Sequence, residues 1–131
     1  MSTAPMRMVE VSGAEALWLL EGSTLGRLVY AQREVTVVRP ARHVWEFGRL
    51  VVRTPVPAAA VPATATYCVD EIRTDIGRLV TVSGPAGVID CPDEAAHHRR
   101  ALAGWAHGPH DTVLRLHPKT VTGFRLVRPE V

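Results

Sequence analysis

The chain has 131 residues, of which 47% are hydrophobic and 21% charged, a composition typical of one soluble globular domain with a sizeable core. The formal net charge of +2 comes from scattered rather than clustered basic residues, so nucleic-acid binding is not expected. No apolar run reaches the length of a membrane span, and residues 1–11 contain no hydrophobic signal core. The sequence therefore predicts a single cytoplasmic domain over residues 1–131.

Potential metal ligands are few and poorly arranged. Cys68 and Cys91 do not form a CxxC motif, and we expect both thiols to be reduced in the cytoplasm. The pair His97-His98 and the spacing His107-x-x-His110 suggest a metal site, but the HxxH pair lies in a Gly-Pro loop and lacks both a helical frame and an evident third ligand. We therefore expect no metal site.

The first predicted element is a helix that begins at Ser12. The Ser12–Glu15 spacing is that of a capping box, and Gly22 is a typical helix-ending residue. The apolar residues of its buried face are Ala16, Leu17, Leu19 and Leu20.

Three antiparallel strands are predicted next, at residues 28–31, 35–45 and 50–53. They are rich in β-branched residues and are separated by polar or glycine-containing turns at residues 32–34 and 46–48. Residues 55–65 carry three prolines and no charge, so they are expected to form an extended connection with at most one helical turn at 58–61.

The remaining predicted elements are short and closely spaced. Strands are expected at 66–72, at 79–83 with its continuation at 86–89 after a bulge or bend at Gly84, at 112–116 and at 121–127. A helix is expected at 92–104, capped by Asp90 or Asp93. Six or seven short strands with two or three helices indicate a mainly β barrel or sandwich.

Several motifs together resemble the pyridoxamine 5′-phosphate oxidase-like family of flavin-binding split barrels. They are Gly26-Arg27-Leu28, Pro40-x-x-His43, the strand Gly48–Thr54, and the segments 68–72, 79–86, 105–111 and 114–126. The resemblance implies a six- to seven-stranded antiparallel split β-barrel with two or three short flanking helices. It also implies a homodimer with a flavin site at the dimer interface.

The same resemblance implies which residues would bind the cofactor. Arg53 and Thr54 correspond to the pair expected to hold the FMN phosphate, and the segment Pro40-Ala41-Arg42-His43 corresponds to the strand beside the isoalloxazine ring. Trp105 belongs to a loop near the partner's cofactor site, where it would stack over the ring. No catalytic residue is implied.

Each of these residues also has a purely structural interpretation. Arg53 can extend its guanidinium into solvent at the end of its strand, and Trp105 can anchor its loop onto the barrel. His43 can be a strand histidine with satisfied hydrogen-bond partners. Alternation along the strand places Arg42 on the face opposite Ala41 and His43. There Arg42 can pair with an anionic ligand or occupy the space of the ring, and we favour the second.

One segment departs from the family pattern. Where family members have Gly-Ser/Thr-Lys after the strand-end Arg-Thr, this chain has PVPAAAVPA, which contains no cation. The first functional prediction is an FMN-binding protein, an oxidoreductase acting on a small redox substrate. The alternative is a non-enzymatic split-barrel dimer that has lost flavin binding or binds another cofactor, such as deazaflavin or haem.

Overall fold

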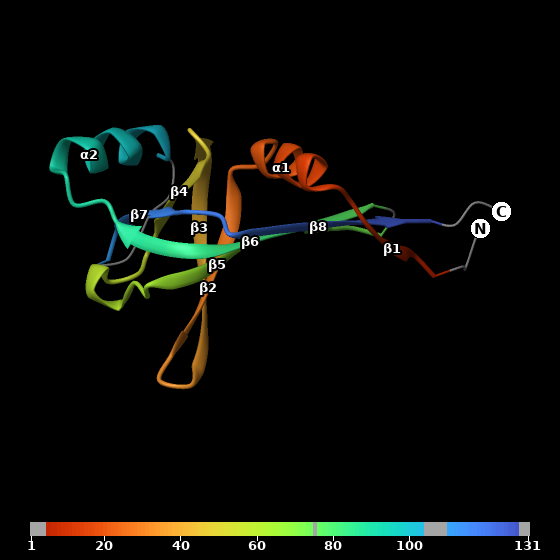
Figure 1. The fold of residues 1–131 in the computed structure, drawn as a ribbon, viewed down its shortest axis with the longest axis horizontal. Coiled ribbons are helices and arrows are strands. Elements are labelled where there is room, and N and C mark those ends of the chain that lie inside the picture. The colour runs from red at the N-terminus through yellow and green to blue at the C-terminus, as the bar shows by residue number, and fades with distance from the viewer. Residues whose placement is uncertain (1–4, 75, 104–109, 129–131) are drawn as a thin grey trace.

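A computed structural model describes residues 5–74, 76–103 and 110–128 (Figure 1). Its helices and strands are, in chain order, β1 Arg7–Glu10, α1 Gly13–Glu21, β2 Leu25–Gln32, β3 Val35–Glu46, β4 Arg49–Thr54, the 3₁₀ turn η1 Ala58–Ala60, β5 Thr64–Ile72, β6 Gly77–Val88, α2 Pro92–Ala101, β7 Thr112–Leu116 and β8 Thr120–Val127. Neither α-helix among the described residues is long and apolar enough to cross a membrane.

The strands form one antiparallel sheet that closes on itself. Their order is β1-β8-β6-β5-β2-β3-β4-β7, and an additional pairing between β6 and β7 closes six of them into a barrel. β8 and β1 extend the sheet beyond the barrel (Figure 1). The predicted fold class, a mainly β, six- to seven-stranded antiparallel split barrel with two or three short flanking helices, is confirmed.

β6 belongs to both parts of the sheet. Its first half pairs with β8 and its residues 86–88 pair with β7. The β7–β8 connection crosses β6 at Gly84, where a Cβ would lie 1.8 Å from the carbonyl oxygen of His117. The sequence predicted a strand at 79–83 that bends at Gly84 and continues at 86–89, and the structure has one continuous strand, β6, which changes partner there.

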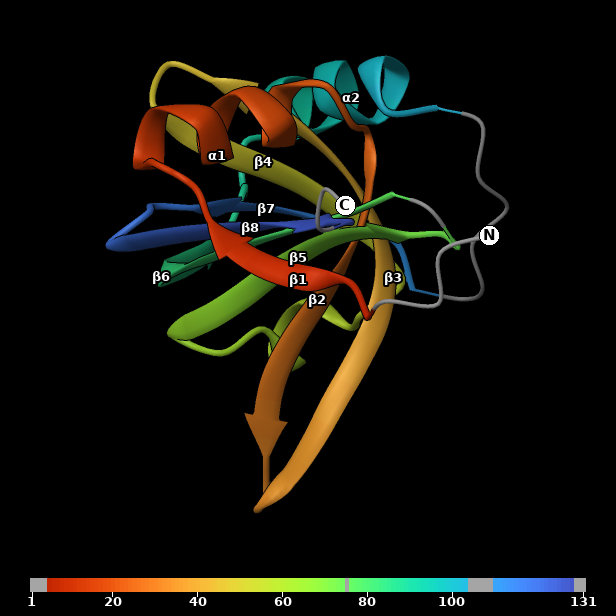
Figure 2. The ribbon, with the colours of Figure 1, turned by 90° about the vertical axis from the view of Figure 1, so that its right-hand side faces the viewer.

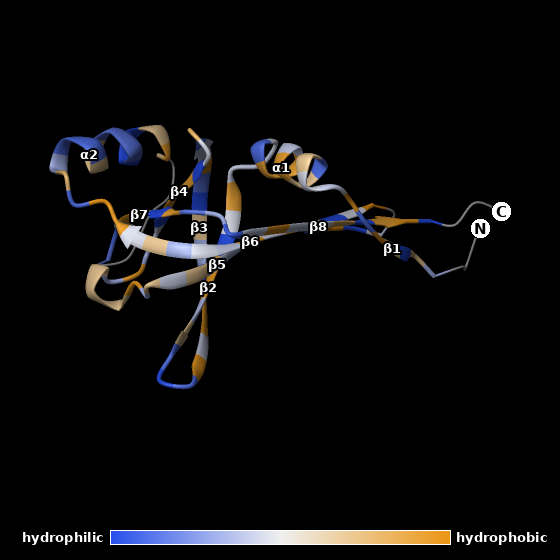
Figure 3. Ribbon diagram, in the orientation of Figure 1, coloured by the Kyte–Doolittle hydropathy of each residue, from blue (hydrophilic) through white to orange (hydrophobic). Residues whose placement is uncertain are grey.

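Two tight hairpins shape β2, β3 and β4. Arg33 and Glu34 both have positive φ, of 50° and 66°, and Phe47 and Gly48 have φ of 52° and 73°. Two successive left-handed residues match the right-handed twist of the flanking strands, as in a type I′ turn. The β2–β3 hairpin projects away from the two helices, and its tip is hydrophilic (Figures 1–3).

The two helices lie on the same side of the barrel (Figures 1 and 2). The predicted start of α1 is confirmed, because the Ser12 hydroxyl oxygen accepts a 3.1 Å hydrogen bond from the Glu15 amide, and Gly22 is the C-cap. The predicted Asp90 or Asp93 cap of α2 is wrong. The N-cap is Cys91, without a side-chain bond, because Pro92 already fills the first helical position.

The apolar side chains form a main core and a smaller satellite. The main core fills the barrel and the underside of α1; its largest members are Tyr67, Leu19, Leu20, Leu28, Leu50, Leu114 and Leu116. The satellite lies between the outer face of the barrel and α2, and consists of Val51, Ile89, Ala95, Leu102 and Val113. It holds the largely hydrophilic α2 against β4 and β7 (Figure 3).

Candidate functional site

The predicted ring-binding segment, residues 40–43, lies in β3, and its side chains face two different environments. Ala41 and His43 point into the barrel and are 0% and 1% exposed, whereas Pro40 is exposed and Arg42 is half-buried on the outer face. The predicted alternation is therefore confirmed. It follows that this segment does not offer one continuous face to a ligand.

His43 is hydrogen-bonded through both ring nitrogens. Its Nε2 lies 3.0 Å from the carbonyl oxygen of Leu20, which can only accept, so Nε2 carries the proton. Its Nδ1 then accepts a 2.6 Å bond from the Tyr67 hydroxyl. Burial lowers the pKa of His43 and raises that of Tyr67, so both are neutral at neutral pH. His43 is thus a core residue with satisfied partners.

Tyr67 links two of the sequence motifs. A Cβ added to Gly26 would lie 2.5 Å from atoms of the Tyr67 ring, so the ring fits there only because position 26 has no side chain. The hydroxyl of the same tyrosine reaches His43. Sequence reasoning missed Tyr67, although its place in the strand 66–72 and the apolar alternation there would have put it inside the barrel.

On the outer face, Arg53 is held by four hydrogen bonds. Its Nε and Nη2 donate to the two carboxylate oxygens of Asp111, at 2.9 and 3.0 Å. Its Nη1 donates to the carbonyl oxygens of Arg99 and Leu102, at 2.9 and 3.0 Å. These carbonyls lie at the C-terminal end of α2, where a helix leaves carbonyl groups without partners. Arg53 therefore clamps the end of α2 to β4 and Asp111.

Two further arginines belong to this clamp. Arg42 is the direct cross-strand neighbour of Arg53 and donates from Nη1 to the carbonyl oxygen of Ala103. Arg99 donates from Nη2 to the backbone carbonyl of Asp111 at 2.8 Å. The Arg42 Nε is buried and has no hydrogen-bond partner. No sequence signal pointed to the pairing of Arg53 with Asp111, because 58 residues separate them.

The two predicted phosphate ligands do not fit a phosphate in this arrangement. Four hydrogen bonds leave Arg53 one N–H, and its side chain is only 13% exposed. Thr54 is fully buried, and its hydroxyl donates a 3.0 Å bond to the carbonyl oxygen of Pro40. A dianionic phosphate needs several free donors. Trp105, the remaining predicted site residue, lies outside the described residues, as does His107.

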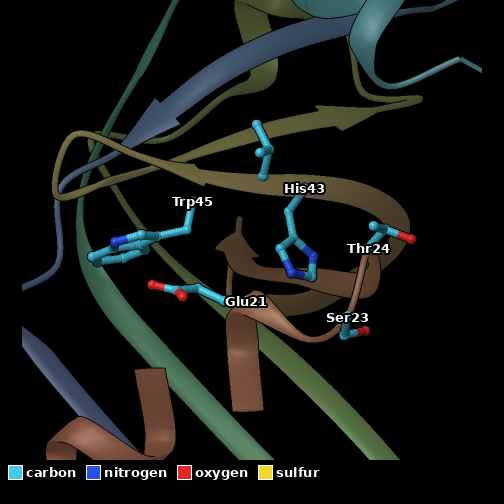
Figure 4. A pocket seen from close by; sticks show the side chains of 6 residues that line it. Glu21, Ser23, Thr24, His43 and Trp45 are labelled. Carbon is cyan, nitrogen blue, oxygen red and sulfur yellow. The ribbon is translucent and has the colours of Figure 1, made fainter. Parts of the chain in front are cut away.

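A pocket of about 350 Å³ opens beside α1, on the far side of β3 from this clamp. It is lined by Glu21, Ser23, Thr24, His43, Val44 and Trp45 (Figure 4). Within residues 5–74, 76–103 and 110–128, no three His, Cys, Asp or Glu side chains gather as a metal site would require. Sequence reasoning did not single out this pocket.

A closed six-stranded barrel with two added strands and two flanking helices defines a split-barrel protein. The family described as pyridoxamine 5′-phosphate oxidase matches residues 12–125, and this chain belongs to that family.

The chain is similar to proteins from several bacteria. It is 32% identical to the uncharacterized protein Rv0080 of Mycobacterium tuberculosis, over 92% of this chain and 86% of the relative. It also resembles the structure of a FAD-binding protein from Mesorhizobium loti, with a TM-score of 0.74 and 19% identity over 94% and 99% of the two chains. A FAD-binding protein from Mycobacterium smegmatis gives a TM-score of 0.68 and 22% identity over 91% and 98%.

Proposed function

We propose that this chain is a non-enzymatic, homodimeric split-barrel module, in which the flavin-phosphate position of the family has become a structural clamp. The observation that carries the proposal is the set of four hydrogen bonds from Arg53 to Asp111 and to the end of α2. A phosphate at this position would have to replace them.

The energetic balance favours the clamp over the phosphate. Hydrogen bonds to charged groups contribute about 1.5–3 kcal/mol each, and freeing Arg53 would also leave Asp111 and two helix carbonyls without this partner. The residues after Thr54 supply no compensating cation, since residues 55–63 read PVPAAAVPA. Tight FMN binding through Arg53 and Thr54 is therefore not expected.

A second candidate is a flavin-binding protein that holds its cofactor without these two residues. Membership of the family supports it, and so does the excess of three guanidinium groups (Arg42, Arg53 and Arg99) over the one carboxylate of Asp111. A flavin bound here would supply hydride-transfer chemistry to a small redox substrate. Deazaflavin and haem remain further cofactors to be tested.

The proposed homodimer is supported by apolar side chains on the outer face of β2 and β3. Leu25 and Val38 are 51% and 47% exposed and share this face with Pro40. Pairing two copies through such a face would remove apolar area from water. Light scattering should give twice the mass of one chain at micromolar concentration, and the mass of one chain would contradict the dimer.

The absorbance spectrum of the purified protein, followed by titration with FMN and with FAD, tests the two candidates. The clamp predicts a colourless protein and no saturable binding of either flavin. A stoichiometric flavin, deazaflavin or haem spectrum would overturn it in favour of the second candidate.

The Arg42→Asn variant tests the role of Arg42 in the same titration. If Arg42 occupies the space of the flavin ring, the FMN affinity of the variant should rise, and a fall would mean that Arg42 contacts a bound flavin.

A further inference from the structure

The pocket beside α1 combines three features that attract positive charge. Glu21 is the last residue of α1, and the last turn of this helix contains no basic residue. The C-terminal end of a helix carries a partial negative charge, so a carboxylate placed there is unfavourable unless a cation offsets it. No hydrogen bond or ion pair of Glu21 is found within the described part of the chain.

The opposite wall of the pocket is aromatic. Trp45 lies two residues after His43 on the inward-facing side of β3, and it is partly buried against the main core. Figure 4 shows the Glu21 side chain reaching toward the Trp45 ring, with Ser23 and Thr24 at the other end of the pocket. The face of an indole ring attracts cations through its quadrupole.

The remaining lining residues add no positive charge. Both ring nitrogens of His43 are already bonded, to Tyr67 and to Leu20, so the imidazole stays neutral. Neither arginine nor lysine lines the pocket. A carboxylate, a helix C-terminus and an indole therefore act in the same direction, and no cation among the described residues lines the pocket to offset them.

We propose that this pocket binds a small organic cation, an alkylammonium or arylammonium, with its charged end at Glu21 and its apolar part against Trp45. The volume of about 350 Å³ is at the lower end for small-molecule pockets, and it suits a compact ligand. The site is separate from Arg53, so the proposal does not depend on whether a flavin is bound.

Benzylamine is the probe, and the uncharged benzyl alcohol and the anionic benzoate are its matched controls. In a ¹H–¹⁵N NMR titration of the full chain, benzylamine should shift the indole N–H signal of Trp45 saturably. The signal of Trp18, which is exposed on the outside of α1, should not move. Equal binding of benzoate or benzyl alcohol would overturn the proposal, as would an unmoved Trp45 signal.

Substitutions at Glu21 and at Trp45, each with a control variant, separate the contribution of the carboxylate from that of the indole ring. Glu21→Gln keeps the shape of the side chain and should weaken benzylamine binding at least tenfold, while Glu10→Gln on β1 should leave it unchanged. Trp45→Leu should weaken it severalfold, and Trp45→Phe should restore part of the loss and guards against a folding defect. Undiminished affinity in Glu21→Gln would refute the assignment.

Discussion

Replacing Arg53 with methionine should destabilise the protein by about 2–4 kcal/mol. The variant keeps much of the aliphatic stem and removes the guanidinium, which is bonded to both oxygens of Asp111 and to two carbonyls of α2. Breaking a fully buried ion pair costs about 3–5 kcal/mol. The side chains of this pair are 13% and 31% exposed, so partial screening by solvent reduces the expected cost.

Urea unfolding followed by circular dichroism measures the effect directly. For a chain of this length, the loss corresponds to a fall of roughly 6–20 °C in melting temperature. A double-mutant cycle with Asp111→Asn should give a coupling energy of about 1–3 kcal/mol, because the two side chains are in direct contact.

A matched control is available on β2, where Arg27 lies opposite Pro40 of β3. Arg27 forms an ion pair with Asp70, but its side chain is 53% exposed, so Arg27→Met should cost less than about 1 kcal/mol. If Arg53→Met is no more destabilising than Arg27→Met, Arg53 is not a clamp and is free for a ligand. The proposed loss of the phosphate position would then have no basis.

Three further predictions concern the barrel interior. Gly26→Ala should lower stability by about 1–3 kcal/mol in urea unfolding, since its Cβ would meet the Tyr67 ring at 2.5 Å. Tyr67→Phe should cost about 1–3 kcal/mol by the same measurement, because the buried Nδ1 of His43 loses its donor; an unchanged midpoint would place that hydrogen bond in doubt. The pKa of His43 is lowered by burial, so the unfolded chain takes up this proton more readily, and stability should fall as pH drops below about 6.5 until the folded histidine also titrates. The unfolding free energy of the wild type, measured across this pH range, should show this fall, and the His43→Gln variant should lack it.

The fold was largely predictable because its strands carry local signals. β-branched runs marked the segments around Val37, Val52 and Val80, and the Ser12–Glu15 spacing marked the start of α1. β1 was missed for a physical reason: all its residues are exposed, so it has no apolar alternation, and it forms by pairing with β8. The Asp caps were wrong because Pro92 competes for the helix start.

The site was predictable only where one strand determines it. Alternation along β3 correctly separated Arg42 from Ala41 and His43. The clamp was not predictable, because Arg53 meets Asp111 and the end of α2 through tertiary packing of segments far apart in the chain. The pocket at Glu21 and Trp45 depends in the same way on how α1 docks against β3.

The short junction of β6 with β7 also bears on aggregation. The barrel is closed there by the pairs from Ala86–Leu116 to Val88–Leu114, next to the crossing at Gly84. If this junction opened, β7 and the end of β6 would become free edges, and free edges pair readily with strands of other molecules. Gly84 leaves room for the backbone that crosses it, and so it helps to keep the chain from self-association through its strand edges.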